Sequence, residues 1–157
     1  MKIRRSVVVF SLVLTLIIVI MLYFIPLPSQ VSISMHGVAL AENDTIIDEG
    51  KITLRGWKLN YLLKSDELLV QQFQILDQSF TNDQNAYTLV YFDSPNNYER
   101  IRGLIYNLSN KELNRIYMCL DIEGNRCYIE LEGLRYIGST EEGFNPLEIS
   151  ENMGRFS

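Results

Sequence analysis

Residues 118–131 are MCLDIEGNRCYIEL, in which apolar and polar side chains alternate on both sides of Gly124-Asn125. Such alternation predicts a strand with one buried face, and Gly-Asn between two such runs predicts a tight hairpin turn. A two-residue turn pairs Leu120 with Ile129. One face of the hairpin is then wholly apolar and holds Met118, Leu120, Ile122, Cys127, Ile129 and Leu131. We therefore expect an antiparallel hairpin whose apolar face lies in a core.

The hairpin belongs to a longer series of apolar segments separated by turn residues. Nine Tyr and seven Phe residues favour strands over a helical bundle. The predicted fold class is all-β, an antiparallel meander of about six or seven strands. A small barrel and a sandwich would both cover the apolar face of such a sheet, and both stay open. The expected strands lie at 51–63, 68–77, 86–93, 101–108, 114–122, 126–132 and 134–138.

The first long hairpin has a break in its alternation at Gly56. The apolar positions are Ile52 and Leu54 before the glycine and then shift by one residue, to Trp57, Leu59, Tyr61 and Leu63. The face expected to be apolar on the return strand holds Leu69, Phe73 and Ile75. A glycine inside a strand, at a point where the apolar phase shifts, predicts a β-bulge.

A continuous apolar segment, VVVFSLVLTLIIVIMLYFI, occupies residues 7–25 and contains no charged residue. As a helix it is ~28 Å long, close to the hydrocarbon thickness of a bilayer. Pro26 stops the helix, and Lys2, Arg4 and Arg5 precede it. Basic residues mark the cytoplasmic end of such helices. We therefore expect one N-terminal transmembrane helix with its N-terminus in the cytoplasm and the following domain extracytoplasmic.

The alternative for this segment is a cleaved signal peptide. The triplet Ala39-Leu40-Ala41 has the small-x-small pattern, but it lies about fifteen residues beyond the apolar run, which is far for signal peptidase. Cleavage after Ala41 is therefore the less favoured alternative. The expected organisation is a short basic cytoplasmic tail at 1–6, the helix at 7–25, a stalk and entry strand at 26–50, an antiparallel β domain at 51–140 and a C-terminal tail at 141–157.

Charge is unevenly distributed along the chain. The net charge is −5, and beyond Arg5 the chain holds eleven basic and nineteen acidic residues. A domain of this sign repels the phosphates of nucleic acids, and no run of Lys or Arg follows Arg5. We therefore expect no nucleic acid partner. The expected partners are the lipid bilayer, contacted through residues 7–25, and a protein or glycan of the cell envelope.

Two cysteines and one histidine limit the chemistry of the domain. The predicted hairpin places Cys119 and Cys127 on opposite faces, which disfavours a disulfide. Cys127 is expected in the core and Cys119 near the surface. Because His36 is the only histidine, multi-histidine metal sites are excluded and a Ser-His-Asp triad is disfavoured. We expect neither a metal nor another cofactor.

Acidic and oxygen-rich segments give weaker signals. Asp121, Glu130 and Glu132 lie on the polar face of the hairpin, where solvent exposure explains them better than glycoside hydrolysis does. The loop at 77–85 is rich in oxygen ligands but lacks the pattern of an EF-hand calcium loop. Glycosylation acceptor triplets begin at Asn43 and Asn107.

Without a catalytic constellation, the leading hypothesis is a non-catalytic interaction or structural module of the cell envelope, held at the membrane. Its edge strands or an aromatic surface would bind the partner. The candidate aromatic residues are Trp57, Tyr61, Tyr87, Tyr91 and Tyr106. Two alternatives stay open: a small envelope hydrolase or lipid-handling domain with a site assembled from scattered residues, and an accessory subunit of a membrane complex.

Overall fold

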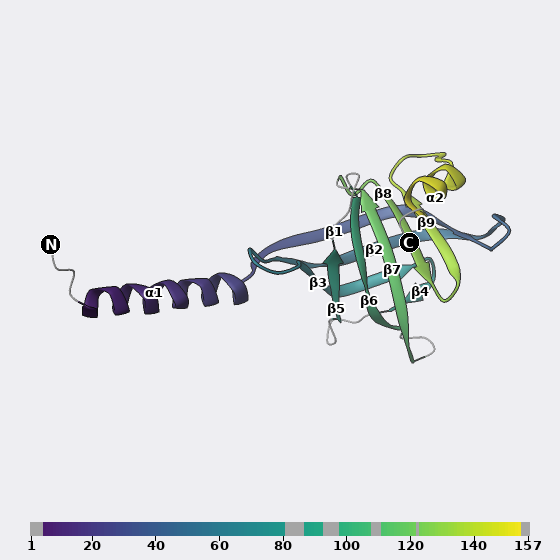
Figure 1. The fold of residues 1–157 in the computed structure, drawn as a ribbon. Helices are drawn as coiled ribbons and strands as arrows, with labels where there is room; N and C mark the ends of the chain where they lie inside the picture. The colour runs from purple at the N-terminus through teal and green to yellow at the C-terminus, as the bar shows by residue number, and fades with distance from the viewer. Residues whose placement is uncertain (1–4, 81–86, 93–97, 108–110, 122, 155–157) are drawn as a thin grey trace.

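The computed structural model describes residues 5–80, 87–92, 98–107, 111–121 and 123–154, which form an apolar helix followed by a β-barrel (Figure 1). The elements, in chain order, are α1 (Arg5–Phe24), β1 (Leu27–Leu40), β2 (Ile46–Asn60), β3 (Glu67–Ile75), β4 (Gln78–Ser79), β5 (Tyr87–Phe92), β6 (Tyr98–Asn107), β7 (Glu112–Asp121), β8 (Arg126–Leu131), β9 (Leu134–Ser139) and α2 (Pro146–Gly154).

Eight of these strands close into an up-and-down barrel. The order around the barrel is β2-β1-β9-β8-β7-β6-β5-β3, and β3 pairs back onto β2. Every pairing is antiparallel, and β4 adds a short pairing to β3. The all-β antiparallel meander predicted from the sequence is confirmed. Its strand number is slightly higher than predicted, and the sheet forms a barrel rather than a sandwich.

Helix α1 carries the apolar segment that precedes the barrel. Its large hydrophobic side chains from Val7 to Phe24 are exposed. By length and composition, α1 is the one helix in the described part of the chain that could cross a membrane. The prediction of an N-terminal apolar helix is therefore confirmed.

Residues 26–50 are part of the barrel instead of a stalk with a short entry strand. Strand β1 is fourteen residues long, and β2 begins at Ile46. The physical reason is that β1 has two partners, since all of it pairs with β2 and His36–Leu40 also pairs with β9. This second pairing closes the barrel and buries Val38, Ala39 and Leu40.

Side chains fill the interior of the barrel. An eight-stranded barrel has an interior just wide enough for side chains to fill or for one small ligand. Here the large side chains that point inward from all around the barrel are almost fully buried in one cluster, which includes Ile52, Leu54, Leu68, Phe73, Phe80, Leu89, Ile101, Ile105, Met118 and Ile129. Features available to a partner therefore lie on the outer surface and at the ends of the barrel.

Helix α2 covers part of the outer surface, where the sequence predicted only a C-terminal tail. Pro146 occupies the first helical position, where its missing N–H costs nothing, and the Asn145 side chain accepts a hydrogen bond from the Leu147 N–H at 3.2 Å. The buried face of α2 contributes Ile149 and Met153 to a second apolar cluster. The barrel residues of this cluster are Val38, Leu40, Cys119, Tyr128 and Ile137. Cys119 is therefore buried, and the expectation that it lies near the surface is wrong.

The hairpin at 118–131 forms, but its register differs from the predicted one by two residues. Leu120 pairs with Cys127 rather than with Ile129. Asp121 causes the difference, because its carbonyl accepts from Gly124 N at 2.9 Å and its carboxylate accepts from Asn125 N at 2.6 Å. These bonds stabilise a longer turn in which Gly124 has a φ of 71°. A shift of two residues keeps each described side chain on its face, so Cys127 lies in the core as predicted, while Ile122 lies outside the described residues.

A bulge does occur at Gly56, but the additional residue lies on the partner strand. Arg55 pairs with Gln72 and Gly56 pairs with Val70, so Gln71 is the extra residue of β3. The inward phase therefore changes along β3, from Leu68 and Val70 to Phe73 and Ile75. Leu69 is only partly buried, contrary to its expected place beside Phe73.

Candidate functional site

The candidate aromatic residues occupy different environments. Trp57 is 38% exposed on the outer side of β2, and Tyr61 is half-buried just after that strand. Tyr91 is 7% exposed and belongs to the interior cluster. The side chains of Tyr87 and Tyr106 lie outside the described part of the chain. Trp57 and Tyr61 therefore do not share a groove with Tyr91.

A charged cluster lies at the mouth of the barrel, by which we mean the end of the barrel nearest α1. Lys58 Nζ lies 2.6 Å from Glu99 Oε1 and 3.7 Å from Asp66 Oδ2. The same ammonium group lies 4.2 Å from the centre of the Tyr91 ring, a cation–π distance. Strands β2, β5 and β6, together with the residue that precedes β3, thus meet at one lysine.

The Tyr91 hydroxyl lies below this cluster. Its oxygen is buried and has no hydrogen-bond partner among the described residues. Burial raises the pKa of Tyr91, and the carboxylates of Glu99 and Asp66 raise it further. A phenol with a raised pKa stays neutral at ordinary pH. The mouth thus holds an ion pair beside a neutral tyrosine.

Strand β1 has a free edge over the part of its length that β9 does not cover. Fourteen residues of β1 pair with β2 but only five pair with β9. The nine residues Leu27–Met35 therefore have one side unpaired among the described strands, and we call them the open edge. An unpaired edge presents free N–H and C=O groups that can bind another strand.

The side chains of the open edge alternate between the barrel and solvent. Val31 and Ile33 are partly buried against the interior cluster, whereas Gln30, Ser32 and Ser34 are exposed. A strand added along this edge would continue the same two faces. The open edge would therefore favour a segment whose apolar and polar side chains alternate.

A hollow of about 720 Å³ lies where β1 leaves β9. It is lined by Ser34, Met35 and His36 of β1, by Gly50 and Lys51 of β2, and by residues 139–143. The His36 ring also contacts Phe144 edge-on, with 6.1 Å between ring centres. The hollow therefore joins the end of the open edge to the loop that follows β9.

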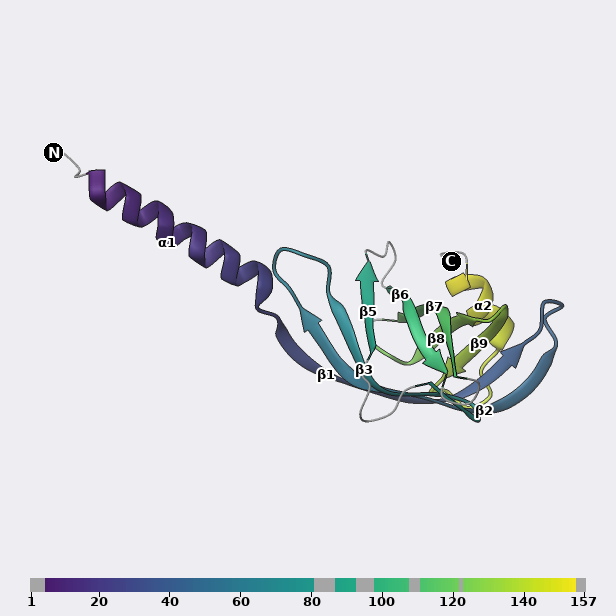
Figure 2. The same ribbon diagram turned by 90° about the horizontal axis from the view of Figure 1, so that it is seen from below.

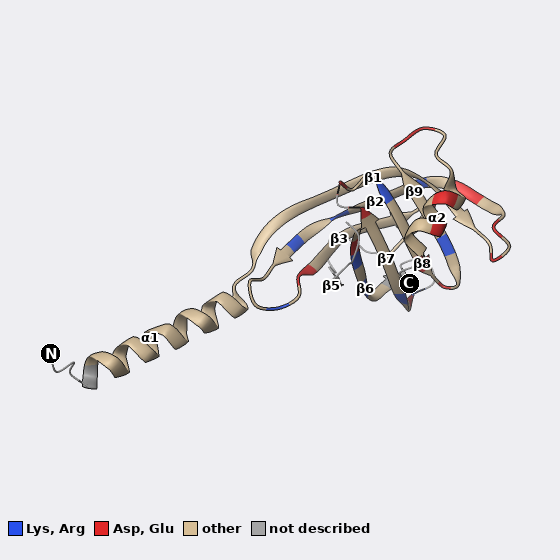
Figure 3. Cartoon of the chain, turned by 45° about the horizontal axis from the view of Figure 1, so that its top comes forward, with Lys and Arg blue, Asp and Glu red and all other residues tan. Residues whose placement is uncertain are grey.

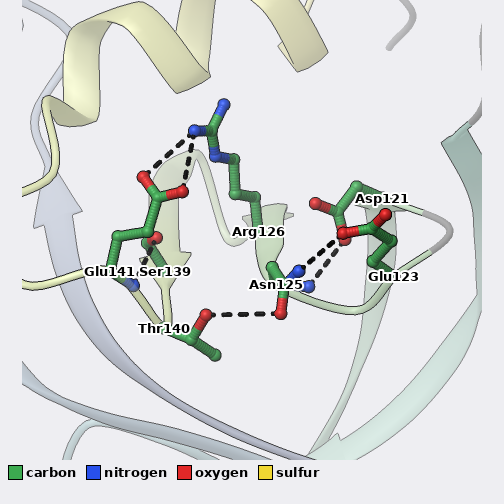
Figure 4. Close-up of polar contacts among 7 residues, drawn as sticks. All are labelled: Asp121, Glu123, Asn125, Arg126, Ser139, Thr140 and Glu141. Carbon is green, nitrogen blue, oxygen red and sulfur yellow. Dashed lines mark hydrogen bonds and ion pairs between the residues drawn. The ribbon is translucent and has the colours of Figure 1, made fainter.

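A polar network fixes the loop that forms one wall of this hollow (Figure 4). Thr140 N donates to the Asn125 carbonyl at 2.9 Å, and Glu141 N donates to Ser139 Oγ at 3.0 Å. Arg126 donates to both carboxylate oxygens of Glu141, at 3.0 and 3.2 Å. The loop is therefore tied to the β7–β8 turn.

The β7–β8 turn lies beside the open edge near Ile33. A Cβ atom added to Gly124 would lie 4.0 Å from Ile33 Cγ1. Within the turn, Asn125 Nδ2 donates to Glu123 Oε2 at 3.0 Å. The open edge is thus flanked by a turn that its own hydrogen bonds make rigid.

The remaining residues considered from the sequence have structural environments of their own. Asp121 stabilises the β7–β8 turn, Glu130 is exposed, and Glu132 accepts a hydrogen bond from Asn114. Asn43 accepts from the Thr45 hydroxyl at 2.7 Å. Most of the loop at 77–85 lies outside the described residues, as does the side chain of Asn107. Over the described ranges, no three His, Cys, Asp or Glu residues are grouped as metal ligands.

Fold and site together define a class, namely a small closed β-barrel that follows an apolar helix and leaves nine of the fourteen residues of its first strand paired on one side only. Comparisons with protein families, with curated proteins and with solved structures found no match. The open edge was missed in the sequence because it depends on where β9 ends. The sequence did carry one signal of this strand, because residues 31–35, VSISM, alternate in polarity before the expected β domain begins.

Proposed function

We propose that this chain is a single-pass membrane protein whose barrel binds an extended segment of a cell-envelope protein by strand addition to the open edge. The observation that carries the proposal is the nine-residue stretch of β1 that pairs on one side only. At about 3.3 Å per residue such an edge is roughly 30 Å long, which is enough for a partner strand of ordinary length.

Main-chain hydrogen bonds would supply much of the affinity in this mode of binding, and side-chain pockets would supply the specificity. Residues of the partner that face the barrel would lie beside Val31 and Ile33, so apolar residues are favoured there. The hollow at the end of the edge offers Lys51 and Glu141 to polar groups of the partner. The partner segment would thus alternate in polarity and end in polar residues.

Membrane anchoring by α1 is the second part of the proposal. The helix has a suitable length and composition for a membrane span. Three basic residues, Lys2, Arg4 and Arg5, lie at its N-terminal end. The barrel would then lie outside the cytoplasm. A reporter that is active only in the cytoplasm, fused after Ser157, should be silent. Reporter activity would show that the orientation is the opposite of the one proposed.

Photo-cross-linking tests the strand-addition proposal. A photoreactive amino acid is introduced at Ser32, an exposed residue of the open edge, in the full chain in its native membrane. The matched control is Glu130, which is exposed but has strands paired on both sides. We expect cross-links from position 32, mapping to one extended segment of one protein. Equal labelling from both positions, or none from position 32, would overturn the proposal.

A further inference from the structure

The connection between β2 and β3 presents apolar side chains to solvent. Leu62 is 64% exposed and Leu63 is 53% exposed, and Tyr61 and Lys64 flank them. We call residues 61–64 the proximal tip. Trp57 lies four residues before Tyr61, on the outer side of β2, and is also exposed. Two neighbouring exposed leucines next to aromatic rings call for a partner that excludes water.

The position of the proximal tip follows from the short link between α1 and β1. Only Ile25 and Pro26 separate the two elements, so Leu27 lies within about 11 Å of the end of the helix. Leu27 pairs with Asn60, whose Nδ2 donates to the Leu27 carbonyl at 2.9 Å. Since β2 runs antiparallel to β1, the chain after Asn60 continues back toward the helix.

The pictures agree with this connectivity, because the β2–β3 connection lies at the same end of the barrel as the end of α1 (Figure 2). The polar headgroup region of a bilayer is roughly 5–8 Å thick on each side of the hydrocarbon. When α1 spans the bilayer, a tip tied to the first residue of β1 would therefore lie close to the headgroup region.

Charge distinguishes the proximal tip from the opposite end of the same strand. Residues 57–67 contain two lysines and two acids, whereas residues 41–51 contain four acids and one lysine. Acidic residues, coloured red, lie at the far end of the β1–β2 hairpin, away from α1 (Figure 3). Anionic headgroups repel the acidic end but not the neutral one.

The charged side chains near the proximal tip are also paired with one another. Lys64 Nζ lies 2.7 Å from Glu67 Oε1 and 3.7 Å from the centre of the Tyr61 ring. Asp66 accepts a hydrogen bond from Tyr61 N at 3.0 Å. These contacts fold the connection and leave Leu62 and Leu63 on its outside, while tyrosine and lysine occupy positions that suit a membrane interface.

We propose that the proximal tip inserts Leu62 and Leu63 into the interface of the bilayer that α1 spans, as a second membrane contact beside the helix. This inference rests on the proposed anchoring by α1. The consequence is a fixed orientation in which the open edge rises from the membrane surface and the acidic hairpin end faces away.

Tryptophan quenching by brominated lipids tests the insertion. Trp57 is the single tryptophan, so the full chain carrying Trp57→Phe gives a silent background. Leu63→Trp then reports the proximal tip. Ile47→Trp is the matched control, since Ile47 is also 53% exposed and lies near the opposite end of β2. Both proteins are reconstituted in phosphatidylcholine vesicles, with and without bromines on the acyl chains.

We expect the tryptophan at position 63 to lose about half of its emission in brominated vesicles, because Trp partitions to the interface, and the one at position 47 to be unchanged. Flotation of the same samples after carbonate washing measures anchoring separately. If the chain floats but positions 63 and 47 lose equal fractions of their emission in brominated vesicles, the insertion of the tip is overturned and the anchoring is not. Chain that does not float would overturn both the anchoring and the tip.

Discussion

At the scale of single residues, two glycines are required because an added Cβ atom would overlap its neighbours, which are main-chain atoms at Gly56 and side-chain atoms at Gly138. A side chain at Gly56 would overlap the Leu69 carbonyl oxygen at the bulge, and a Cβ on Gly138 would lie 2.7 Å from Cys127 Sγ. The sequence indicated the first glycine through the shift in apolar phase. Nothing local marked Gly138, because its nearest neighbour, the Met35 side chain, comes from a strand distant in the chain.

Gly56→Ala should therefore destabilise the barrel by about 1–3 kcal/mol, because the added methyl group meets a main-chain atom that cannot rotate away. Chemical denaturation of the full chain in detergent, followed by tyrosine and tryptophan fluorescence, measures the change. The neighbouring exposed residue gives the control, and Arg55→Ala should change stability by under about 0.5 kcal/mol. Equal effects from the two variants would contradict the account.

The two buried thiols give a second prediction at this scale. Burial raises the pKa of Cys119 from 9.0 to about 11 and the pKa of Cys127 to about 12. Because the thiolate is the reactive form, the folded protein at pH 8 should react with a thiol reagent at least about 100-fold more slowly than the unfolded chain. Rapid labelling of the folded protein would show that the thiols are accessible.

The same shifts predict loss of stability at alkaline pH. Both thiols hold their protons in the folded state at a pH where the unfolded chain has lost them. Their contribution is therefore complete below pH 9 and is lost as the pH rises toward 12. Tyr117, whose pKa burial raises to about 12, acts in the same direction. Denaturation midpoints measured from pH 7 to 11 should fall only above about 9.

At the scale of elements, α2 protects one outer patch of the barrel. Met153 and Ile149 lie four residues apart on its buried face, over Cys119 and Tyr128. The sequence carried the signals of this helix, since Asn145-Pro146 marks a helix start and the two apolar residues share a face. These signals are weak because a helix of nine residues is short beside the strong alternation of the preceding strands.

Met153→Ala should destabilise the docking of α2 by about 2–5 kcal/mol, the range for a buried methionine. The consequence that identifies the mechanism is selective. Cys119 lies under the helix and should become reactive, whereas Cys127 lies inside the barrel and should stay protected. Mass spectrometry of the labelled peptides separates the two thiols. Exposure of both together would mean that α2 and the barrel unfold as one unit.

Register is the property of an element that the alternation determined least. The hydrophobic pattern assigned each residue of the 118–131 hairpin to a face, and a displacement of two residues leaves those faces unchanged. The choice between a two-residue and a longer turn depended on the side chain of Asp121, which accepts from Asn125 N. Local hydrogen bonding of this kind is not visible in a pattern of polarity.

At the scale of the whole molecule, closure of the barrel depends on residues about one hundred positions apart. His36 pairs with Ser139 and Leu40 with Arg135, so β1 and β9 meet only in the folded chain. The sequence predicted a meander but not which strands close it, since partner choice rests on the summed packing of the interior. The same pairing ends at His36 and thereby creates the open edge.

Residue-resolved hydrogen exchange of the full chain in lipid nanodiscs tests the open edge most directly, and it needs no knowledge of the partner. Amides of His36–Leu40 that point toward β9 should exchange slowly, because both sides of that segment are paired. Within Leu27–Met35, fast and slow amides should alternate, since only those directed at β2 are bonded. Uniformly slow exchange from residue 27 to residue 40 would contradict the account, because it would mean that the edge of β1 is already covered.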